Sequence, residues 1–96
     1  MIYRLILSPD ANDGIRSAFL WYLEQDIDLP FRFTGDLEST LNRIAQNPYR
    51  FSPFADQLRR ARMKRFPYFI YFTVIERAIY VIAVSHQRRL NPLSRP

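Results

Sequence analysis

The chain has 96 residues, of which 48% are hydrophobic, and it carries a formal net charge of +5. This length and apolar content exclude a disordered chain, so we expect a single domain over residues 1–96. Cysteine is absent and His86 is the only histidine, which excludes disulfides and thiolate sites and argues against a histidine metal site. We therefore expect no metal and no cofactor.

The basic residues are concentrated in the C-terminal part of the chain. Residues 57–96 hold nine basic side chains and one acidic side chain, whereas residues 1–56 hold five basic and eight acidic ones. All of the basic residues except Lys64 are arginines. Because a guanidinium fork binds phosphate or carboxylate with two hydrogen bonds, we expect an anionic partner.

An alternating apolar run over residues 2–7 predicts the first strand. The run is too short for a signal peptide and lacks the basic start that such a peptide has. No window approaches the roughly 20 apolar residues of a membrane-spanning helix. We therefore expect a cytoplasmic protein that makes no membrane contact.

Two helices follow the first strand. Ser8-Pro9-Asp10 has the residues of a helix start, and apolar spacing carries the first helix to about Gln25. Residues 26–30 form the expected connector, and Asn47-Pro48 ends the second helix. One face of the second helix carries the apolar residues Phe33, Leu37, Leu41 and Ile44. The short connector predicts an antiparallel helical hairpin.

The C-terminal half changes to a period of two, which is typical of strands. Residues 49–56 are expected to form an ordered loop, and residues 85–96 an irregular tail. The expected strands are Gln57–Arg65, Tyr68–Ile75 and Ala78–Val84. The predicted fold class is α+β in the order β-α-α-β-β-β, with the N-terminal helical hairpin packed on one face of an antiparallel sheet.

The first of these strands places cations on the open face of the sheet. Alternation directs Arg60, Arg62 and Lys64 to one side, while the next strand directs Phe69 and Tyr71 to the same side. We interpret these five residues as a surface that binds an anionic partner. Cations beside rings suit single-stranded RNA, and they equally suit an acidic amphipathic segment. An arginine-rich strand can also be a solvated edge that resists aggregation.

The end of the last strand carries the candidates for catalysis. His86 has an intrinsic pKa near neutrality and is a candidate general acid or base. Arg88 and Arg89 are candidates for stabilising a phosphorane-like transition state. The alternative is that His86 is a hydrogen-bonding residue at a strand end and that both arginines face solvent.

Two features of the helices receive structural interpretations. Trp21 and Tyr22 on the first helix are typical of core or helix–helix packing. Asp36 on the second helix is interpreted as ordinary solvated surface.

Four segments, taken together and in order, give the chain a resemblance to the RelE/ParE superfamily of toxins from bacterial type II toxin–antitoxin systems. The segments are LILSPDANDGI, RFTGDLESTLNRIAQNP, RRARMKRFPYFIYF and VIAVSHQRRLNP. The resemblance implies a compact sheet that carries a helical hairpin. It also implies a cognate antitoxin protein that wraps the toxin and neutralises it. The surface that binds the target or the antitoxin is then expected at Arg60, Arg62, Lys64, Phe69 and Tyr71.

The two branches of this superfamily differ in target. RelE-like members are ribosome-dependent, metal-independent mRNA endoribonucleases, and Arg60 and Arg62 fall where that branch has alternating lysines. The chain departs from that branch at Phe69 and Gln87, where the branch has arginines, and no tyrosine follows Tyr80.

ParE-like members inhibit DNA gyrase by binding it. Many relatives are described only as plasmid-stabilisation proteins. The chain is closer to them through its Phe-Pro-Tyr and His-x-Arg-Arg sequences. The expected function is therefore a ParE-like gyrase inhibitor. The alternative is a RelE-like ribonuclease that uses His86 with Arg88 or Arg89, and a further alternative is a non-toxic nucleic-acid-binding module.

Overall fold

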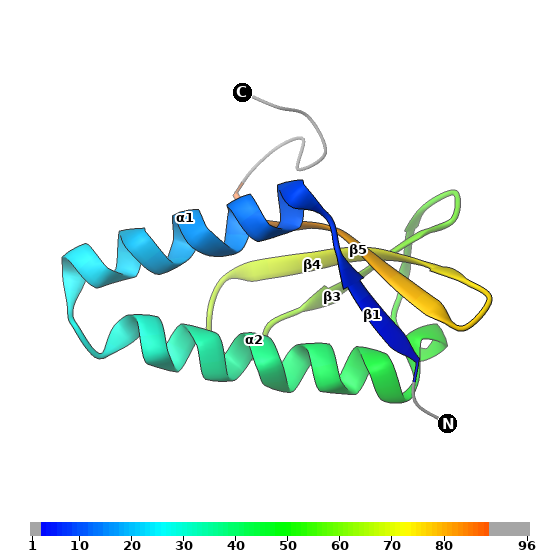
Figure 1. Cartoon of the computed structure of the whole chain (residues 1–96), viewed down its shortest axis with the longest axis horizontal. Coiled ribbons are helices and arrows are strands. Elements are labelled where there is room, and N and C mark those ends of the chain that lie inside the picture. Colours follow the sequence, from blue (N-terminus) through cyan, green and yellow to red (C-terminus); the bar gives the residue numbers. More distant parts are fainter. Residues whose placement is uncertain (1–2, 89–96) are drawn as a thin grey trace.

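A computed structural model gives the fold of the chain and describes residues 3–88. The elements, in chain order, are β1 (Arg4–Leu7), α1 (Pro9–Gln25), α2 (Leu29–Gln46), the 3₁₀ helix η1 (Pro48–Arg50), β2 (Pro53–Ala55), β3 (Leu58–Arg62), β4 (Tyr68–Ile75) and β5 (Ala78–His86). The α+β class is confirmed, with the helical hairpin after the first strand (Figure 1). The structure adds η1 and the short strand β2 in the segment that was expected to be a loop.

The strands form one mixed sheet in the order β1-β5-β4-β3-β2. β3, β4 and β5 pair antiparallel, as expected, and β2 adds a further antiparallel pair with β3. The sheet is not wholly antiparallel as predicted, because β1 pairs parallel to β5, with Leu5 opposite Ile79. A parallel pair requires a long connection. The helical hairpin and the three strands that follow it supply that connection and return the chain to the open edge of β1.

Helix α1 is tied directly to the sheet at its first turn. The Ser8 hydroxyl accepts a hydrogen bond from the Ala11 N–H (3.0 Å) and donates one to the Ile82 carbonyl (2.8 Å). One turn later, Gly14 lies so close to β5 that a Cβ atom there would overlap the backbone carbonyl oxygen of Val84. The structure confirms the predicted bounds of α1. Its start was predictable because the N-cap Ser8 and the following Pro9 are adjacent in the sequence.

Helix α2 begins at Leu29, so the connector is shorter than predicted. The Asp28 N–H donates to the Asp26 side chain (2.8 Å), which turns the chain sharply between the helices. Pro30 lies in the first turn of α2, where a helix tolerates proline because the N–H it lacks would have no helical partner. Among residues 3–88, no helix is both long enough and apolar enough to cross a membrane.

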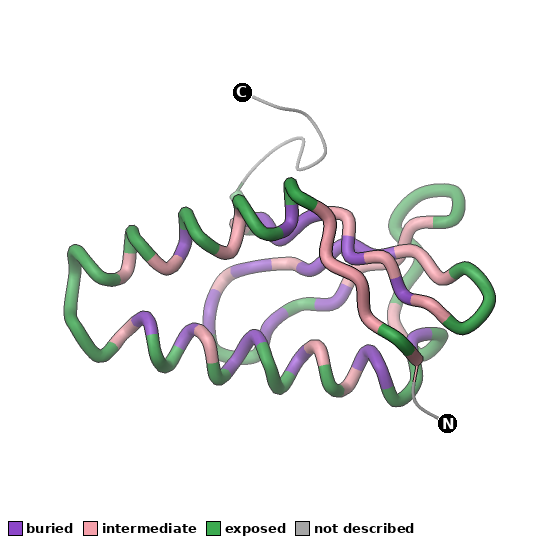
Figure 2. Tube along the Cα trace, viewed as in Figure 1, coloured by how far each residue is buried: buried purple, intermediate pink, exposed green. Residues whose placement is uncertain are grey.

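The core lies between the helical hairpin and one face of the sheet. Figure 2 shows the buried residues of both helices and of the strands between them, with the exposed residues on the outer sides of the helices. The Phe33 ring lies 5.3 Å from the Tyr68 ring, and the Tyr22 ring lies 4.9 Å from the Phe66 ring. These contacts fix which face of β4 is covered, and they leave the opposite face free of helices.

Candidate functional site

The helix-free face of the sheet carries the two arginines of β3 that alternation predicted. Arg60 pairs with Tyr71 and Arg62 pairs with Phe69 in the register of β3 and β4. Their neighbour Ala61 pairs with Ile70 and is 1% exposed beneath the helices. Because successive residues of a strand point to opposite faces, Arg60 and Arg62 project away from the helices. We call this helix-free side the open face.

The Arg60 guanidinium is held between two aromatic rings. Its Cζ atom lies 4.3 Å from the centroid of the Phe69 ring and 5.0 Å from that of the Phe54 ring. Neither Arg60 nor Arg62 makes an ion pair with another described residue. A cation held by rings keeps its charge available to an outside anion, because no carboxylate neutralises it.

Tyr71 lies beneath this surface, although it was expected to contribute an exposed ring. Its side chain is 4% exposed. The Phe54 ring of β2 packs edge-on against it, with centroids 5.1 Å apart. Phe54 is itself 40% exposed and takes the outer position. Sequence reasoning missed Phe54 because the three residues of β2 are too few to show a period.

Arg62 connects β3 to the residue that follows β5. Its Nη2 atom donates to the Gln87 Oε1 atom (3.2 Å), and its Nη1 atom donates to the Met63 carbonyl (3.4 Å). The side chain remains exposed. These bonds orient the guanidinium and leave it accessible from solvent at the edge of the open face.

Lys64 lies in the turn after β3 rather than on the strand itself. The strand was predicted to reach Arg65, but it ends at Arg62. Asp36 of α2 explains the difference. Its carboxylate accepts hydrogen bonds from the backbone N–H groups of Lys64 (3.3 Å), Arg65 (2.8 Å) and Phe66 (2.9 Å).

Asp36 is 7% exposed, so its interpretation as solvated surface was wrong. A carboxylate that accepts several backbone N–H bonds is a strong local anchor. The consequence is that Lys64 and Arg65 extend from a turn that is pinned to the helical hairpin, and not from the flat part of the sheet.

His86 lies on the other side of the sheet from Arg60 and Arg62. It pairs with Tyr68, whose ring lies 5.2 Å away and edge-on, and Tyr68 belongs to the covered face. The His86 Nδ1 atom accepts a hydrogen bond from the Arg88 N–H (3.1 Å). The structure therefore does not bring the imidazole together with the β3 arginines. Arg89 lies outside the described residues.

Tyr68, beside His86, and Tyr22, beside Tyr68, hold their protons at neutral pH. Burial raises the pKa of Tyr68 to about 12, and interaction with Tyr22 adds to the shift. Burial also raises the pKa of Tyr22, partly offset by its hydrogen bond to Tyr68. Raised pKa values make these hydroxyls weaker acids, so they serve the core and are poorly suited to proton donation.

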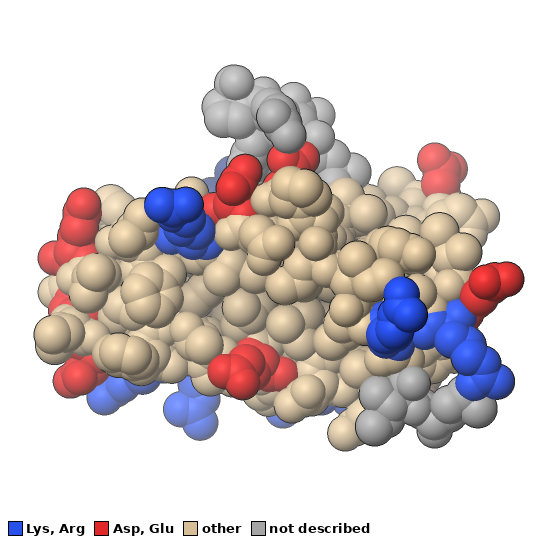
Figure 3. Space-filling view, in the orientation of Figure 1, with Lys and Arg blue, Asp and Glu red and all other residues tan. Residues whose placement is uncertain are grey.

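The end of the helical hairpin exposes several apolar side chains, among them Trp21, which the sequence interpretation assigned to core or helix–helix packing. Trp21 is 57% exposed, whereas its neighbour Tyr22 packs on the core. The other exposed apolar residues at this end are Leu20, Leu23, Ile27 and Phe31. Figure 3 shows several acidic groups around this end, with basic groups also beside it, and basic groups together with an acidic one at the opposite end. Grouped apolar exposure of this kind is typical of a protein-binding surface.

Comparison with known proteins gives a family and a fold. Residues 5–91 match the family described as "ParE toxin of type II toxin-antitoxin system, parDE". A solved chain described as "Chromosomal ParDE TA system from P. aeruginosa" has a TM-score of 0.78 at 12% identity, covering 88% of this chain and 96% of that one. At this identity the likeness shows the fold alone. No curated protein matches this chain.

Proposed function

Because this chain belongs to the ParE toxin family of type II toxin–antitoxin systems, we propose that it inhibits DNA gyrase by binding it through the open face of the sheet. The family assignment agrees with the resemblance seen in the sequence. The position of Arg60 between the rings of Phe54 and Phe69 supports binding most directly. Arg60 and Arg62 make no ion pair with another residue in the range 3–88, so at the sheet surface they form a preorganised site for an anionic partner.

The placement of His86 favours binding over catalysis. A ribonuclease needs a proton-transfer group within reach of the cations that hold the phosphate. Here His86 lies on the covered side of the sheet and its Nδ1 atom accepts a backbone hydrogen bond, while Arg60 and Arg62 lie on the open face. Inhibition by binding needs no such arrangement.

The antitoxin is proposed to neutralise the toxin by covering the same face. A cognate antitoxin is the expected partner of a type II toxin. An acidic segment that folds as it binds would place carboxylates on Arg60 and Arg62 and apolar side chains on the exposed rings. Competition for one surface then explains how the toxin is released when the antitoxin is removed.

Two assays distinguish the candidate targets. We expect expression of the chain alone to arrest growth, and co-expression of its antitoxin to restore growth. We expect the purified chain to inhibit supercoiling by purified gyrase, and the antitoxin to relieve this inhibition. Cleavage of mRNA on translating ribosomes, with supercoiling unaffected, would replace this proposal with the ribonuclease. Growth without arrest would contradict both.

A further inference from the structure

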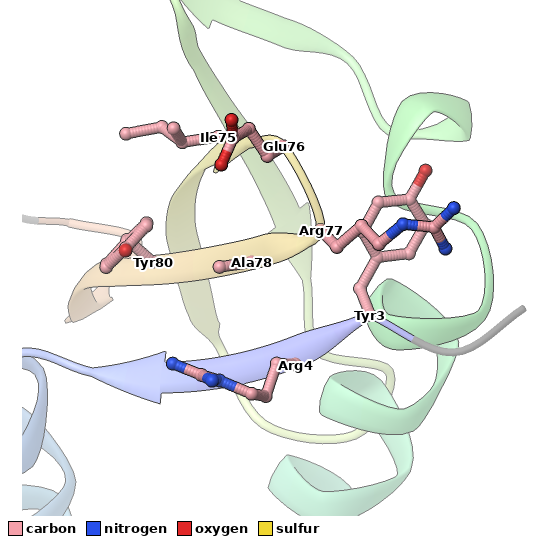
Figure 4. Close-up of a pocket in the computed structure, with 7 residues that line it drawn as sticks. All are labelled: Tyr3, Arg4, Ile75, Glu76, Arg77, Ala78 and Tyr80. Carbon is pink, nitrogen blue, oxygen red and sulfur yellow. The ribbon is translucent and has the colours of Figure 1, made fainter.

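The end of the molecule opposite the α1–α2 connector gathers arginines and tyrosines from four separate segments. Arg4 of β1 and Arg77 of the β4–β5 turn are joined through their backbones, since the Arg4 N–H donates to the Arg77 carbonyl (3.0 Å). Figure 4 shows both side chains with Tyr3 and Tyr80 around the start of β5. Arg4 and Arg77 are 73 positions apart in the sequence, yet they share one surface.

A hollow of about 590 Å³ lies between these side chains. Its lining includes the two arginines, both tyrosines and the apolar side chain of Ile75, which is 55% exposed. The strand register explains why charged and apolar side chains lie next to each other in this lining. Arg4 pairs with Ala78, and Ala78 pairs with Ile75, so a cation and an apolar side chain stand in one row on the open face.

The same surface continues around the end of the sheet to η1. The Tyr3 ring lies 6.4 Å from the Tyr49 ring, edge-on, and the Cζ atom of Arg59 lies 5.2 Å from the Tyr49 centroid. The Arg59 Nη1 atom also donates to the Phe51 carbonyl (2.7 Å), which fixes the guanidinium. Tyr49 is 55% exposed, so its ring is both supported and accessible.

The exposed cations at this end lack carboxylate partners within the described part of the chain. Arg4, Arg50 and Arg77 are exposed, and none of them makes an ion pair with another residue in the range 3–88. The lining of the hollow contains one acidic residue, Glu76, and two arginines, Arg4 and Arg77. The excess positive charge favours an anionic ligand, and the exposed rings favour one that also has flat apolar surfaces.

We propose that this arginine–tyrosine end, formed by Arg4, Arg50, Arg59, Arg77, Tyr3 and Tyr49, binds single-stranded nucleic acid. Phosphates bind the exposed guanidinium groups, one unstacked base stacks on Tyr49, and another enters the hollow against Ile75. Arginines that track a backbone beside exposed rings are the usual arrangement for such strands, because every base has a π face. An acidic peptide would use the cations but would leave Tyr49 without a matching flat group.

Arg4 and Arg77 lie at the β1 side of the sheet, and β5 and β4 separate β1 from β3, which carries Arg60 and Arg62 of the proposed gyrase surface. The test changes neither Arg60 nor Arg62, so its outcome is independent of the gyrase proposal. The full-length chain, made by cell-free synthesis, is titrated into a fluorescein-labelled oligothymidylate, and binding is followed by fluorescence anisotropy across a range of salt concentrations. We expect Arg4→Gln/Arg77→Gln to weaken binding about tenfold, and to reduce the salt slope by roughly 1.4 for two lost phosphate contacts.

The control Arg16→Gln/Arg32→Gln removes the same net charge from the exposed outer sides of the helices, and we expect it to bind nearly as the wild type does. We expect Tyr49→Leu to weaken binding roughly fivefold or more at high salt, where stacking dominates. Circular dichroism confirms the fold of each variant. Equal losses from both double variants would show non-specific attraction and overturn the proposal. Preference for duplex DNA or for polyglutamate over the single strand would also overturn it.

Discussion

The Asp36→Ala substitution tests how the helical hairpin holds the basic turn after β3. The Asp36 carboxylate accepts three backbone N–H groups, from Lys64, Arg65 and Phe66. Removing it leaves all three donors without an acceptor. The prediction is a loss of global stability together with a local loosening of the turn.

The magnitude follows from the burial of each donor. A buried N–H without a partner costs roughly 1–3 kcal/mol. The bond from Phe66 is buried and counts in full, whereas the bonds from Lys64 and Arg65 are only partly buried, so water can replace part of them. We therefore expect Asp36→Ala to lower the free energy of unfolding by about 2–4 kcal/mol.

Urea denaturation and amide hydrogen exchange measure the two parts of this prediction. The control is Glu38→Ala on the exposed side of the same helix, which we expect to change stability by less than about 0.5 kcal/mol. Exchange at Lys64, Arg65 and Phe66 should accelerate more than exchange in β4. An Asp36→Ala protein as stable as the Glu38→Ala protein, with the Phe66 amide still protected, would refute the reasoning.

Three further predictions concern packing, capping and pH. Gly14→Ala should lower the free energy of unfolding, measured by urea denaturation, by roughly 1–3 kcal/mol, because the new Cβ meets the Val84 carbonyl. Gly35→Ala should raise it by about 0.5–1 kcal/mol, because a Cβ there meets nothing within 4 Å. The opposite ranking would contradict the close packing of α1 on β5. Ser8→Ala should lower the melting temperature, since it removes an N-cap worth about 1 kcal/mol and a bond to β5. Burial raises the pKa of Tyr68 from 10.0 to about 12, so the folded state keeps the phenol proton at a pH where the unfolded chain loses it. The stability that the protonated phenol contributes is therefore fully present below pH 10 and is lost as pH rises toward 12. Alkaline denaturation of Tyr68→Phe should show a shallower fall in stability over that window, and an unchanged slope would contradict the assignment.

Local signals in the sequence were sufficient for most of the secondary structure. Ser8 and Pro9 define the start of α1, and β4 runs from Tyr68 to Ile75 as its alternation predicted. These elements depend on contacts between residues close in sequence, so a single chain reveals them. The direction of β1 was not predictable in this way, because its partner β5 lies at the other end of the chain.

Long-range contacts explain where the predictions for the candidate site differ from the structure. Alternation placed Arg60 and Arg62 correctly on the helix-free face. The end of β3 depends on Asp36, which lies 28 residues before Lys64, and no pattern near the strand reveals it. Tyr71 is covered by Phe54, which belongs to a strand too short to show a period.

The arginine–tyrosine end was even less predictable from local sequence patterns. Arg4, Tyr49, Arg59 and Arg77 come from β1, η1, β3 and the β4–β5 turn. In the sequence Arg4 and Arg77 are single arginines, Tyr49 lies in the expected loop, and Arg59 belongs to the arginine-rich strand, so no local pattern links them. Only the sheet order, with β1 beside β5, brings them to one end of the molecule.

The affinity of purified gyrase for the Arg60→Gln/Arg62→Gln variant tests the central claim most directly. We expect binding to weaken about tenfold or more relative to the wild type, because arginines in a desolvated interface commonly dominate its energy. Trp21→Ala, at the exposed end of the helical hairpin, should leave the affinity nearly unchanged. Unchanged affinity for the double variant, with a large loss for Trp21→Ala, would contradict the account and move the binding surface to the helices.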